Sequence, residues 1–145
     1  MRVVLRLGAA AGSVLLAGLL AGCPMTASGG TGECDTDRDC VTSVCARDHL
    51  CYPASSVREV RVTWTVRGMV ANSQTCAGSQ DLQIAFYNNN AGDDALGFAP
   101  VPCMIGQFLI DKLPTSYTEV ELGRQGSFPD RKSIGSTNVV EFDLR

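Results

Sequence analysis

The cysteines are the residues whose type and spacing most directly indicate chemistry in this chain. There are seven among 145 residues. Cys34, Cys40, Cys45 and Cys51 fall within 18 residues, with five, four and five residues between them. This spacing lacks the Cys-x-x-Cys pairs of structural zinc sites and favours disulfide bonds in an exported chain. Residues 33–53 have too few apolar side chains for a core, so we expect bridges to determine their shape.

The pairing of these four cysteines has three possible forms. We favour Cys34 with Cys45 and Cys40 with Cys51, because crossed links hold the two halves of the segment together. With its C-x-x-D-x-D-C type of opening, the segment resembles the small cysteine-rich modules of exported bacterial and animal proteins.

Two further cysteines, Cys76 and Cys103, fall beside predicted strands. A bridge between them would close a loop of 28 residues, which in the chain-entropy description contributes roughly 3 to 4 kcal/mol. Free thiols would not suit an oxidising compartment. These assignments leave Cys23 as the one cysteine without a partner.

Three alternating aspartates, Asp35, Asp37 and Asp39, resemble the start of a calcium-binding loop. The glycine and glutamate that an EF-hand has at its sixth and twelfth positions are Cys40 and Ala46 here. We therefore favour a solvated acidic turn whose carboxylates cap backbone amides. Calcium binding remains the alternative, and no metal or other cofactor is predicted.

Catalytic residues are not evident, and we expect the protein not to be an enzyme. Catalysis would require a nucleophile with a base, a metal, or two separated carboxylates. His49, the single histidine, lies in the cysteine-rich segment, where a solvated or bridge-packed ring is expected. Glu119 and Glu121 share one face of a predicted strand about 7 Å apart, as a glycosidase pair could. They lie opposite Val120 and Leu122, which favours a solvated sheet surface.

The first 23 residues resemble the export signal of bacterial lipoproteins. A cationic start, Met1 to Arg6, precedes 14 apolar residues from Leu7 to Leu20, too few to cross a hydrocarbon core of about 30 Å. Leu20-Ala21-Gly22-Cys23 matches the lipobox position for position. The resemblance implies a signal peptide over 1–22, removed to leave a diacylated Cys23 whose two chains anchor the protein to the membrane. An uncleaved anchor helix, or an ordinary signal peptide, is the alternative.

Residues 23–32 form an uncharged, aperiodic stretch typical of a flexible tether. Pro24 is not the Asp that retains enteric lipoproteins at the inner membrane, so the resemblance favours an outer-membrane location in the bacterial cell envelope. After residue 22 the chain has 10 basic and 15 acidic residues, a net charge of −5. This charge disfavours a nucleic-acid partner.

From residue 57 to residue 145 the pattern predicts a small antiparallel β-sandwich of the immunoglobulin-like or prealbumin-like kind. Apolar and polar residues alternate with the period of two that a half-buried strand requires. Prolines confine an extended piece around Pro100 to Cys103 to a sheet edge, and residues 88–94 form a polar loop. The predicted inward-facing residues are Val60, Val62, Trp64, Val66, Leu82, Ile84, Phe86, Phe108, Ile110, Thr118, Val120, Leu122, Val140, Phe142 and Leu144.

Residues 106–122 carry a second resemblance. Their strand, Leu-Pro-x-x-Tyr turn and strand are similar to fibronectin-like and carboxypeptidase-regulatory-like (prealbumin-like) sandwich domains. The resemblance implies that Tyr117 packs at the corner of the turn and that its hydroxyl bonds to backbone. Ser116 stands where the family usually has glycine. Such a domain implies a binding or structural module and no particular chemistry.

Two functions fit these features. The first is a lipid-anchored, non-catalytic binding module for a polysaccharide or an envelope protein. The second is a structural accessory subunit of an envelope complex, with no small ligand. Aromatic side chains gathered on one rim would favour sugar binding, and the candidates are Tyr52, Tyr87, Phe98 and Phe128.

Overall fold

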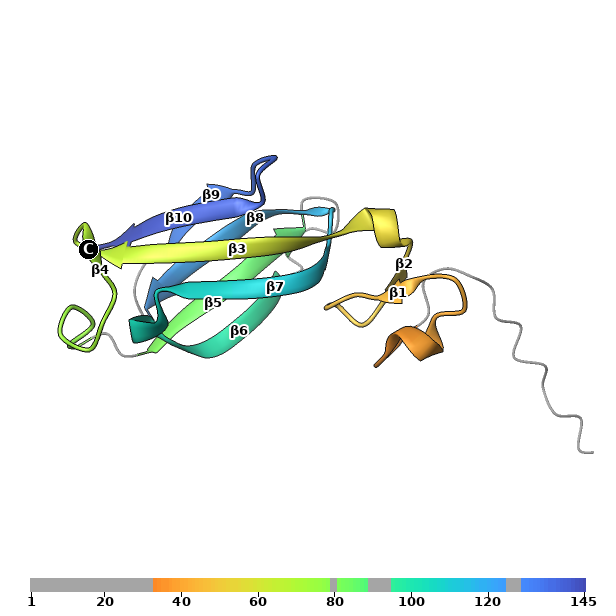
Figure 1. The fold of residues 1–145 in the computed structure, drawn as a ribbon, viewed down its shortest axis with the longest axis horizontal. Coiled ribbons are helices and arrows are strands. Elements are labelled where there is room, and N and C mark those ends of the chain that lie inside the picture. The colour runs from red at the N-terminus through yellow and green to blue at the C-terminus, as the bar shows by residue number, and fades with distance from the viewer. Residues whose placement is uncertain (1–32, 79–80, 89–94, 125–128) are drawn as a thin grey trace, which may run out of the picture.

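A computed structural model describes residues 33–78, 81–88, 95–124 and 129–145. Two four-stranded sheets pack face to face, and a small disulfide-rich module precedes them at one end (Figure 1). The chain is therefore an all-β sandwich preceded by a disulfide-rich module, as the sequence predicts. The signal peptide, Cys23, the tether, most of the polar loop and Phe128 lie outside the described residues. No helix in the described ranges is long and apolar enough to span a membrane.

The module is a short hairpin joined to a turn. The 3-10 helix η1 (Asp37–Asp39) comes first, and β1 (Val44–Cys45) then pairs antiparallel with β2 (Cys51–Tyr52). Disulfides join Cys34 to Cys45 and Cys40 to Cys51, which is the crossed pairing favoured from the sequence. A second 3-10 helix, η2 (Ala54–Ser56), leads into the sandwich.

The first sheet is built around β3 (Val57–Val66). On one side it pairs with β10 (Val139–Leu144), and on the other with β7 (Gln107–Pro114) and β4 (Met69–Val70). β4 follows β3 through a tight turn at Arg67 and Gly68, whose φ angles of 52° and 74° suit a type I′ hairpin.

The pair β3–β10 is parallel, within a sandwich that is antiparallel as the sequence predicts. Every other strand pair in the described residues is antiparallel. The reason is the crossover after β9 (Asp130–Ser133), an edge strand of the second sheet. The crossover ends at Asn138, whose carbonyl oxygen accepts a hydrogen bond from the backbone N–H of Arg61 in the first half of β3. From there β10 runs in the same direction as β3.

The second sheet has the order β6-β5-β8-β9. It contains β5 (Asp81–Asn88), β6 (Ala95–Pro102) and β8 (Tyr117–Arg124), and a third short helix, η3 (Cys103–Ile105), joins β6 to β7. The edge position of β6 is the one its prolines predict, although the strand begins at Ala95 rather than near Pro100. The sequence analysis missed β9 because its four residues are polar and exposed.

One hydrophobic core fills the space between the sheets. Phe86 is fully buried at its centre, with its ring centroid 6.1 Å from that of Phe98 and 6.4 Å from that of Phe108. Trp64 is buried and donates a hydrogen bond from Nε1 to the carbonyl oxygen of Cys103 (2.7 Å). The predicted alternation is confirmed in β3, β5 and β10, whereas Phe108 and Thr118 are only partly buried.

The Cys76–Cys103 disulfide is present as well. Both cysteines are buried in the sandwich core. The bridge fastens the loop after β4 to η3, at the end of the sandwich opposite the module.

Candidate functional site

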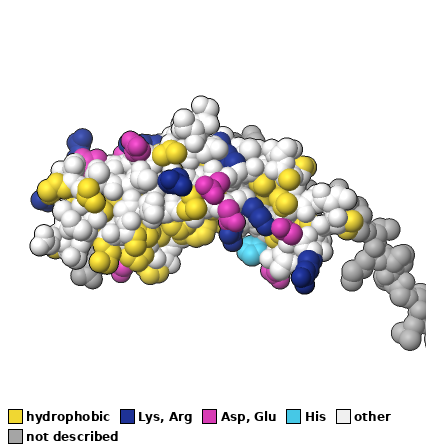
Figure 2. Space-filling view, viewed as in Figure 1, with side chains coloured by type: hydrophobic (Ala, Val, Ile, Leu, Met, Phe, Trp, Pro, Cys, Tyr) yellow, Lys and Arg dark blue, Asp and Glu magenta, His cyan; other side chains and the backbone are white. Residues whose placement is uncertain are grey.

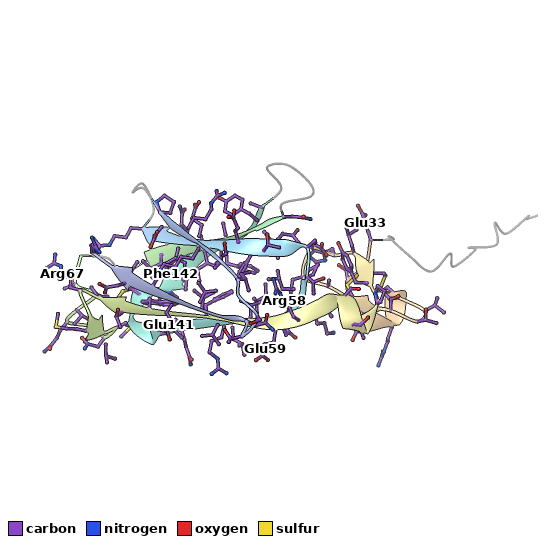
Figure 3. The ribbon with its side chains drawn as sticks, turned by 90° about the horizontal axis from the view of Figure 1, so that it is seen from above. Glu33, Arg58, Glu59, Arg67, Glu141 and Phe142 are labelled. Atoms are coloured by element: carbon purple, nitrogen blue, oxygen red, sulfur yellow. A yellow bond between two sulfur atoms is a disulfide. The ribbon has the colours of Figure 1, made fainter. Side chains whose placement is uncertain are left out.

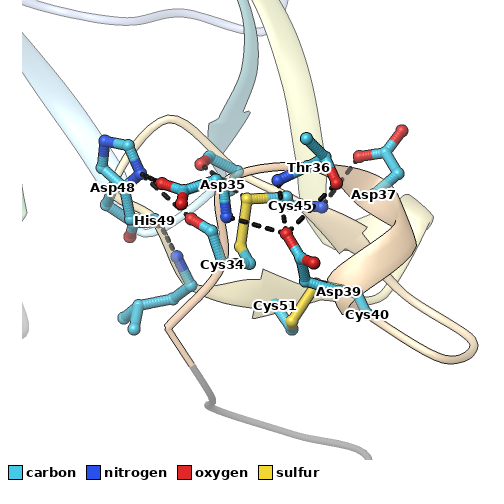
Figure 4. Close-up of a disulfide and its surroundings, with 12 residues drawn as sticks. Cys34, Asp35, Thr36, Asp37, Asp39, Cys40, Cys45, Asp48, His49 and Cys51 are labelled. Carbon is cyan, nitrogen blue, oxygen red and sulfur yellow. Dashed lines mark hydrogen bonds and ion pairs between the residues drawn. A yellow bond between two sulfur atoms is a disulfide. The ribbon is translucent and has the colours of Figure 1, made fainter.

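The acidic turn of the module uses two of its aspartates as caps (Figure 4). Asp39 accepts hydrogen bonds from the backbone N–H groups of Thr36 (2.8 Å) and Asp35 (3.0 Å), and these bonds lower the pKa of its carboxyl group. Asp37 accepts from the backbone N–H of Cys45 (2.9 Å). This is the capping arrangement favoured from the sequence.

A metal site is not assembled from these aspartates. Within the described part of the chain, three ligand-type atoms gather within 4.8 Å of one another only at the sulfurs of Cys34, Cys40 and Cys51. Those sulfurs are already bonded in the two disulfides of the module. The calcium alternative therefore has no cluster of carboxylates to support it.

His49 packs beside the first bridge. Its Nδ1 donates to the carbonyl oxygen of Cys34 (3.0 Å) and lies 3.7 Å from Asp35 Oδ1. Its backbone carbonyl accepts a hydrogen bond from the N–H of Cys34 (2.8 Å). The residue thus connects the two ends of the module, which is the structural role expected for it.

The module contacts the sandwich at a bulge in β7. Asp111 and Lys112 together lie opposite Glu59 there, and Lys112 has a φ of 49°. The carbonyl oxygen of Lys112 accepts a hydrogen bond from the backbone N–H of Arg47 (3.2 Å). The Arg47 side chain pairs with Asp111, and Lys112 Nζ pairs with Asp37 (2.7 Å). Sequence reasoning missed this junction because nothing in the sequence marks the position of the bulge.

These contacts lower the pKa of both carboxyl groups. For Asp37 the largest cause is the hydrogen bond from Lys112, followed by the backbone N–H of Cys45. For Asp111 it is the hydrogen bond from Arg47. All four charged side chains are at least a third exposed, so each pair is a surface ion pair of modest strength.

Glu119 and Glu121 are placed side by side on the outward face of β8, with Arg131 of β9 between them. Arg131 Nη2 lies 3.1 Å from Glu121 Oε2, and Arg131 Nη1 lies 3.6 Å from Glu119 Oε2. Its guanidinium carbon lies 3.7 Å above the centre of the Tyr87 ring. The two glutamates are thus engaged in a cross-strand ion-pair network on the sheet surface.

The aromatic candidates for sugar stacking do not form a platform within the described residues. Tyr52 donates from its hydroxyl to Asp48 Oδ2 (2.9 Å), and partial burial with this hydrogen bond raises the pKa of Tyr52 to about 12. Tyr87 is covered by Arg131. Phe98 packs against the core.

Exposed apolar side chains instead gather along one edge of the first sheet. We call this set the apolar rim, and each of its members is more than half exposed. Figure 2 shows hydrophobic side chains at the lower left, over β4 and η3. The apolar rim consists of Met69, Val70, Met104, Ile105 and Leu109.

The strand register places Val70 and Leu109 of the apolar rim on one face of the first sheet. Val70 lies across from Thr65 and Leu109 across from Arg61, both on the outward face of β3. Between them, Gly106 accepts a hydrogen bond from the backbone N–H of Trp64 (3.0 Å), so the end of η3 lies between β4 and β7 beside β3. Val70 and Leu109 therefore share the outward face, with the end of η3 between them, whereas Met69 lies across from the buried Val66 and borders the apolar rim from the other face of the sheet.

No family model matches the chain. Searches of curated proteins and of solved structures likewise find no match.

A sequence signal for the apolar rim does exist, although the analysis of periodicity passed over it. Residues 95–110 contain no charged side chain at all. This run supplies β6, η3 and the first half of β7, so it contributes to an edge strand of each sheet. Charged residues usually protect such edges, and this run carries none.

Proposed function

We propose that this protein is a lipid-anchored lipoprotein of the bacterial envelope, at the outer membrane, and that its sandwich is a non-catalytic module that binds another envelope protein through the apolar rim. Leu20-Ala21-Gly22-Cys23 supports the lipid anchor. The apolar rim carries the binding proposal, because large exposed apolar patches mark interaction surfaces in soluble domains.

A protein partner is favoured over a polysaccharide. Sugars stack on exposed aromatic rings, whereas the apolar rim contains only aliphatic and thioether side chains. Methionine is enriched at protein interfaces because its flexible side chain adapts to the partner. The position of the apolar rim, at the end of β3 remote from the module, also leaves it accessible when the N-terminal side of the chain is anchored (Figure 1).

The resemblance to fibronectin-like and prealbumin-like domains is part of the same proposal. It is supported by the placement of Tyr117, which is buried where β8 begins. Arg58 donates to the backbone carbonyl of Tyr117 (2.7 Å) and to Asn138 Oδ1 (3.1 Å), and so fastens this corner. Domains of this kind serve as binding modules in larger assemblies, which fits a partner-binding role.

Lipidation is tested by replacing Cys23→Ser. The variant is expected to leave the membrane fraction, because the acyl chains provide its membrane affinity. Retention of Cys23→Ser in carbonate-washed membranes would contradict the anchor.

Partner binding is tested by photo-cross-linking in intact cells. A photoreactive amino acid at Val70 or Met104 is expected to give a discrete adduct, and the same residue at Ser133, exposed on the far edge of the second sheet, is the control. Adducts of equal yield from all three positions, or none from the apolar rim, would contradict the proposal. An adduct from every exposed face would instead support the structural accessory subunit.

A further inference from the structure

A cationic cavity adjoins the apolar rim at the end of the sandwich remote from the module. Its volume is about 420 Å³. Two arginines, Arg67 from the β3–β4 turn and Arg124 from the end of β8, line it, and none of its lining residues is acidic. Met69 belongs to both this cavity and the apolar rim. The full lining is Val66, Arg67, Met69, Gln74, Thr75, Ala77, Gly78 and Arg124.

One wall of this cavity is held in place before any ligand arrives. Asn72 Oδ1 accepts hydrogen bonds from the backbone N–H groups of Gln74 (2.8 Å) and Thr75 (3.0 Å), and Thr75 Oγ1 accepts one from the N–H of Asn72 (2.9 Å). The Cys76–Cys103 disulfide then fastens this loop to the core. A rigid wall reduces the entropy that binding must overcome.

Arg67, like Arg38 and Arg61, has no carboxylate partner among the described residues, and of these three arginines it is the one that lines the cavity. Arg47, Lys112 and Arg131 all contact carboxylates. Arg67 makes no ion pair with any residue that the structure describes.

Asp143, the carboxylate that bonds to the β3–β4 turn, is already engaged. Asp143 accepts hydrogen bonds from the backbone N–H of Gly68 (2.7 Å) and from Thr65 Oγ1 (2.9 Å). It does not line the cavity. Arg124 also lines a neighbouring cavity together with Asp130 and Asp143, so Arg67 is the cation that is offered to an anion here. In a chain with an excess of acidic residues, a cavity lined by Arg67 and by no acid complements an anion.

We propose that this cavity binds a carboxylate side chain of the same partner that covers the apolar rim, so that the partner surface is apolar with an acidic residue beside it. The inference rests on the proposed function. Arginine guanidinium groups bind carboxylates in a two-pronged geometry. Val66, Met69 and Ala77 lie beside the arginines, which suits an acidic residue flanked by apolar ones rather than a strongly hydrated polyanion.

Two synthetic peptides provide the probe, one with the sequence Ser-Leu-Glu-Leu-Glu-Leu-Ser and one with glutamine in place of both glutamates, each with blocked ends. Their affinities for the full chain are measured by calorimetry. We expect the glutamate peptide to bind about tenfold more tightly at low salt, as charge-assisted hydrogen bonds imply. The difference should shrink in about 0.5 M NaCl, where the Debye length is only a few ångströms.

Arg67→Gln is expected to remove most of the preference for the glutamate peptide. Arg38→Gln is the matched control, since it removes the same charge from an exposed arginine of η1, in the module, and should leave the preference intact. Figure 3 shows Arg67 and Glu33, which precedes η1, at opposite ends of the molecule.

Equal affinities for the two peptides, or an equal loss in the two variants, would overturn the inference, and so would the absence of binding by either peptide. Oligogalacturonate is a probe for an acidic polysaccharide. If it binds the native chain but not Arg67→Gln, and the glutamate peptide does not bind, the result overturns the inference in favour of an acidic polysaccharide. Cross-links from Val70 that persist alongside any of these results would leave the proposed function standing. If those cross-links are absent as well, both proposals fail.

Discussion

The module and the sandwich keep their shapes by different means. In the module, the cluster of buried residues consists of cysteines alone, joined in two bridges. In the sandwich, 20 buried side chains from both sheets form one core, and a single bridge is added to it. The comparison shows that covalent cross-links replace a hydrophobic core where the segment is too short to bury one.

The largest effect on the sandwich is expected from Trp64→Ala. The change should lower the free energy of unfolding by roughly 3 to 5 kcal/mol, because it removes a large buried ring and leaves a cavity. It also leaves the carbonyl oxygen of Cys103 without its hydrogen-bond donor. Urea unfolding followed by circular dichroism measures the loss.

Thr65→Ala is the control for that experiment. Thr65 faces outward and bonds to Asp143 at the surface, so its removal should cost well under about 1 kcal/mol. Equal urea midpoints for the two variants would mean that the core does not depend on Trp64.

Removing the Cys76–Cys103 bridge by Cys76→Ala with Cys103→Ala should cost the sandwich roughly 3 to 4 kcal/mol. The sandwich should still fold, because its core remains. The thermal midpoints of this variant and of the native chain, both measured without reductant so that the module bridges stay intact, give the loss. A variant that unfolds completely would show that this bridge is as essential to the sandwich as the bridges are to the module.

Removing a bridge of the module by Cys40→Ser with Cys51→Ser should unfold residues 33–53 while changing the stability of the sandwich by less than about 1 kcal/mol. Hydrogen exchange by mass spectrometry distinguishes the two regions. Rapid exchange should be confined to the module. Simultaneous loss of protection in β3 and β5 would show that the two regions fold as one unit.

The junction between the two regions should respond to acid. The folded-state pKa values of Asp37 and Asp111 both lie below the ordinary value of 3.8, so their ion pairs are fully formed above that pH and are lost as the pH falls through the lowered values. The amide resonance of Arg47, which reports the contact with Lys112, should shift in that range. Asp111→Asn should reduce the shift, and an unchanged titration in this variant would exclude Asp111 as its source.

The sequence predicts the faces of the strands better than their neighbours. Alternation in Val60 to Val66 identifies the buried face because that face must exclude water. The same alternation says nothing about which strand lies beside β3, so the parallel partner β10 could not be predicted. β9 could not be predicted either, because none of its four residues is apolar. The bulge at Lys112 is accompanied by contacts between Arg47 and β7 that form only in the folded chain.

The candidate site was harder to predict than the disulfides. The spacing of the four module cysteines favours disulfides, and crossed links suit a segment that lacks a core. Exposed apolar residues have no such signature, because Met104 and Leu109 belong to the same uncharged run as the buried Val101 and Ile110. Only the folded register separates those that face solvent from those that face the core.

The length and direction of β3 have a mechanical consequence. The strand runs from the module toward the apolar rim, and it is hydrogen-bonded to β10 and β7 on its two sides. With the proposed lipid anchor at one end and the proposed partner on the apolar rim, a pulling force between them would act along this strand. It would load the ladder bonds, which lie across the strand direction, in shear and all at once. A connection of this kind resists tension far better than an edge strand that can be peeled away one bond at a time.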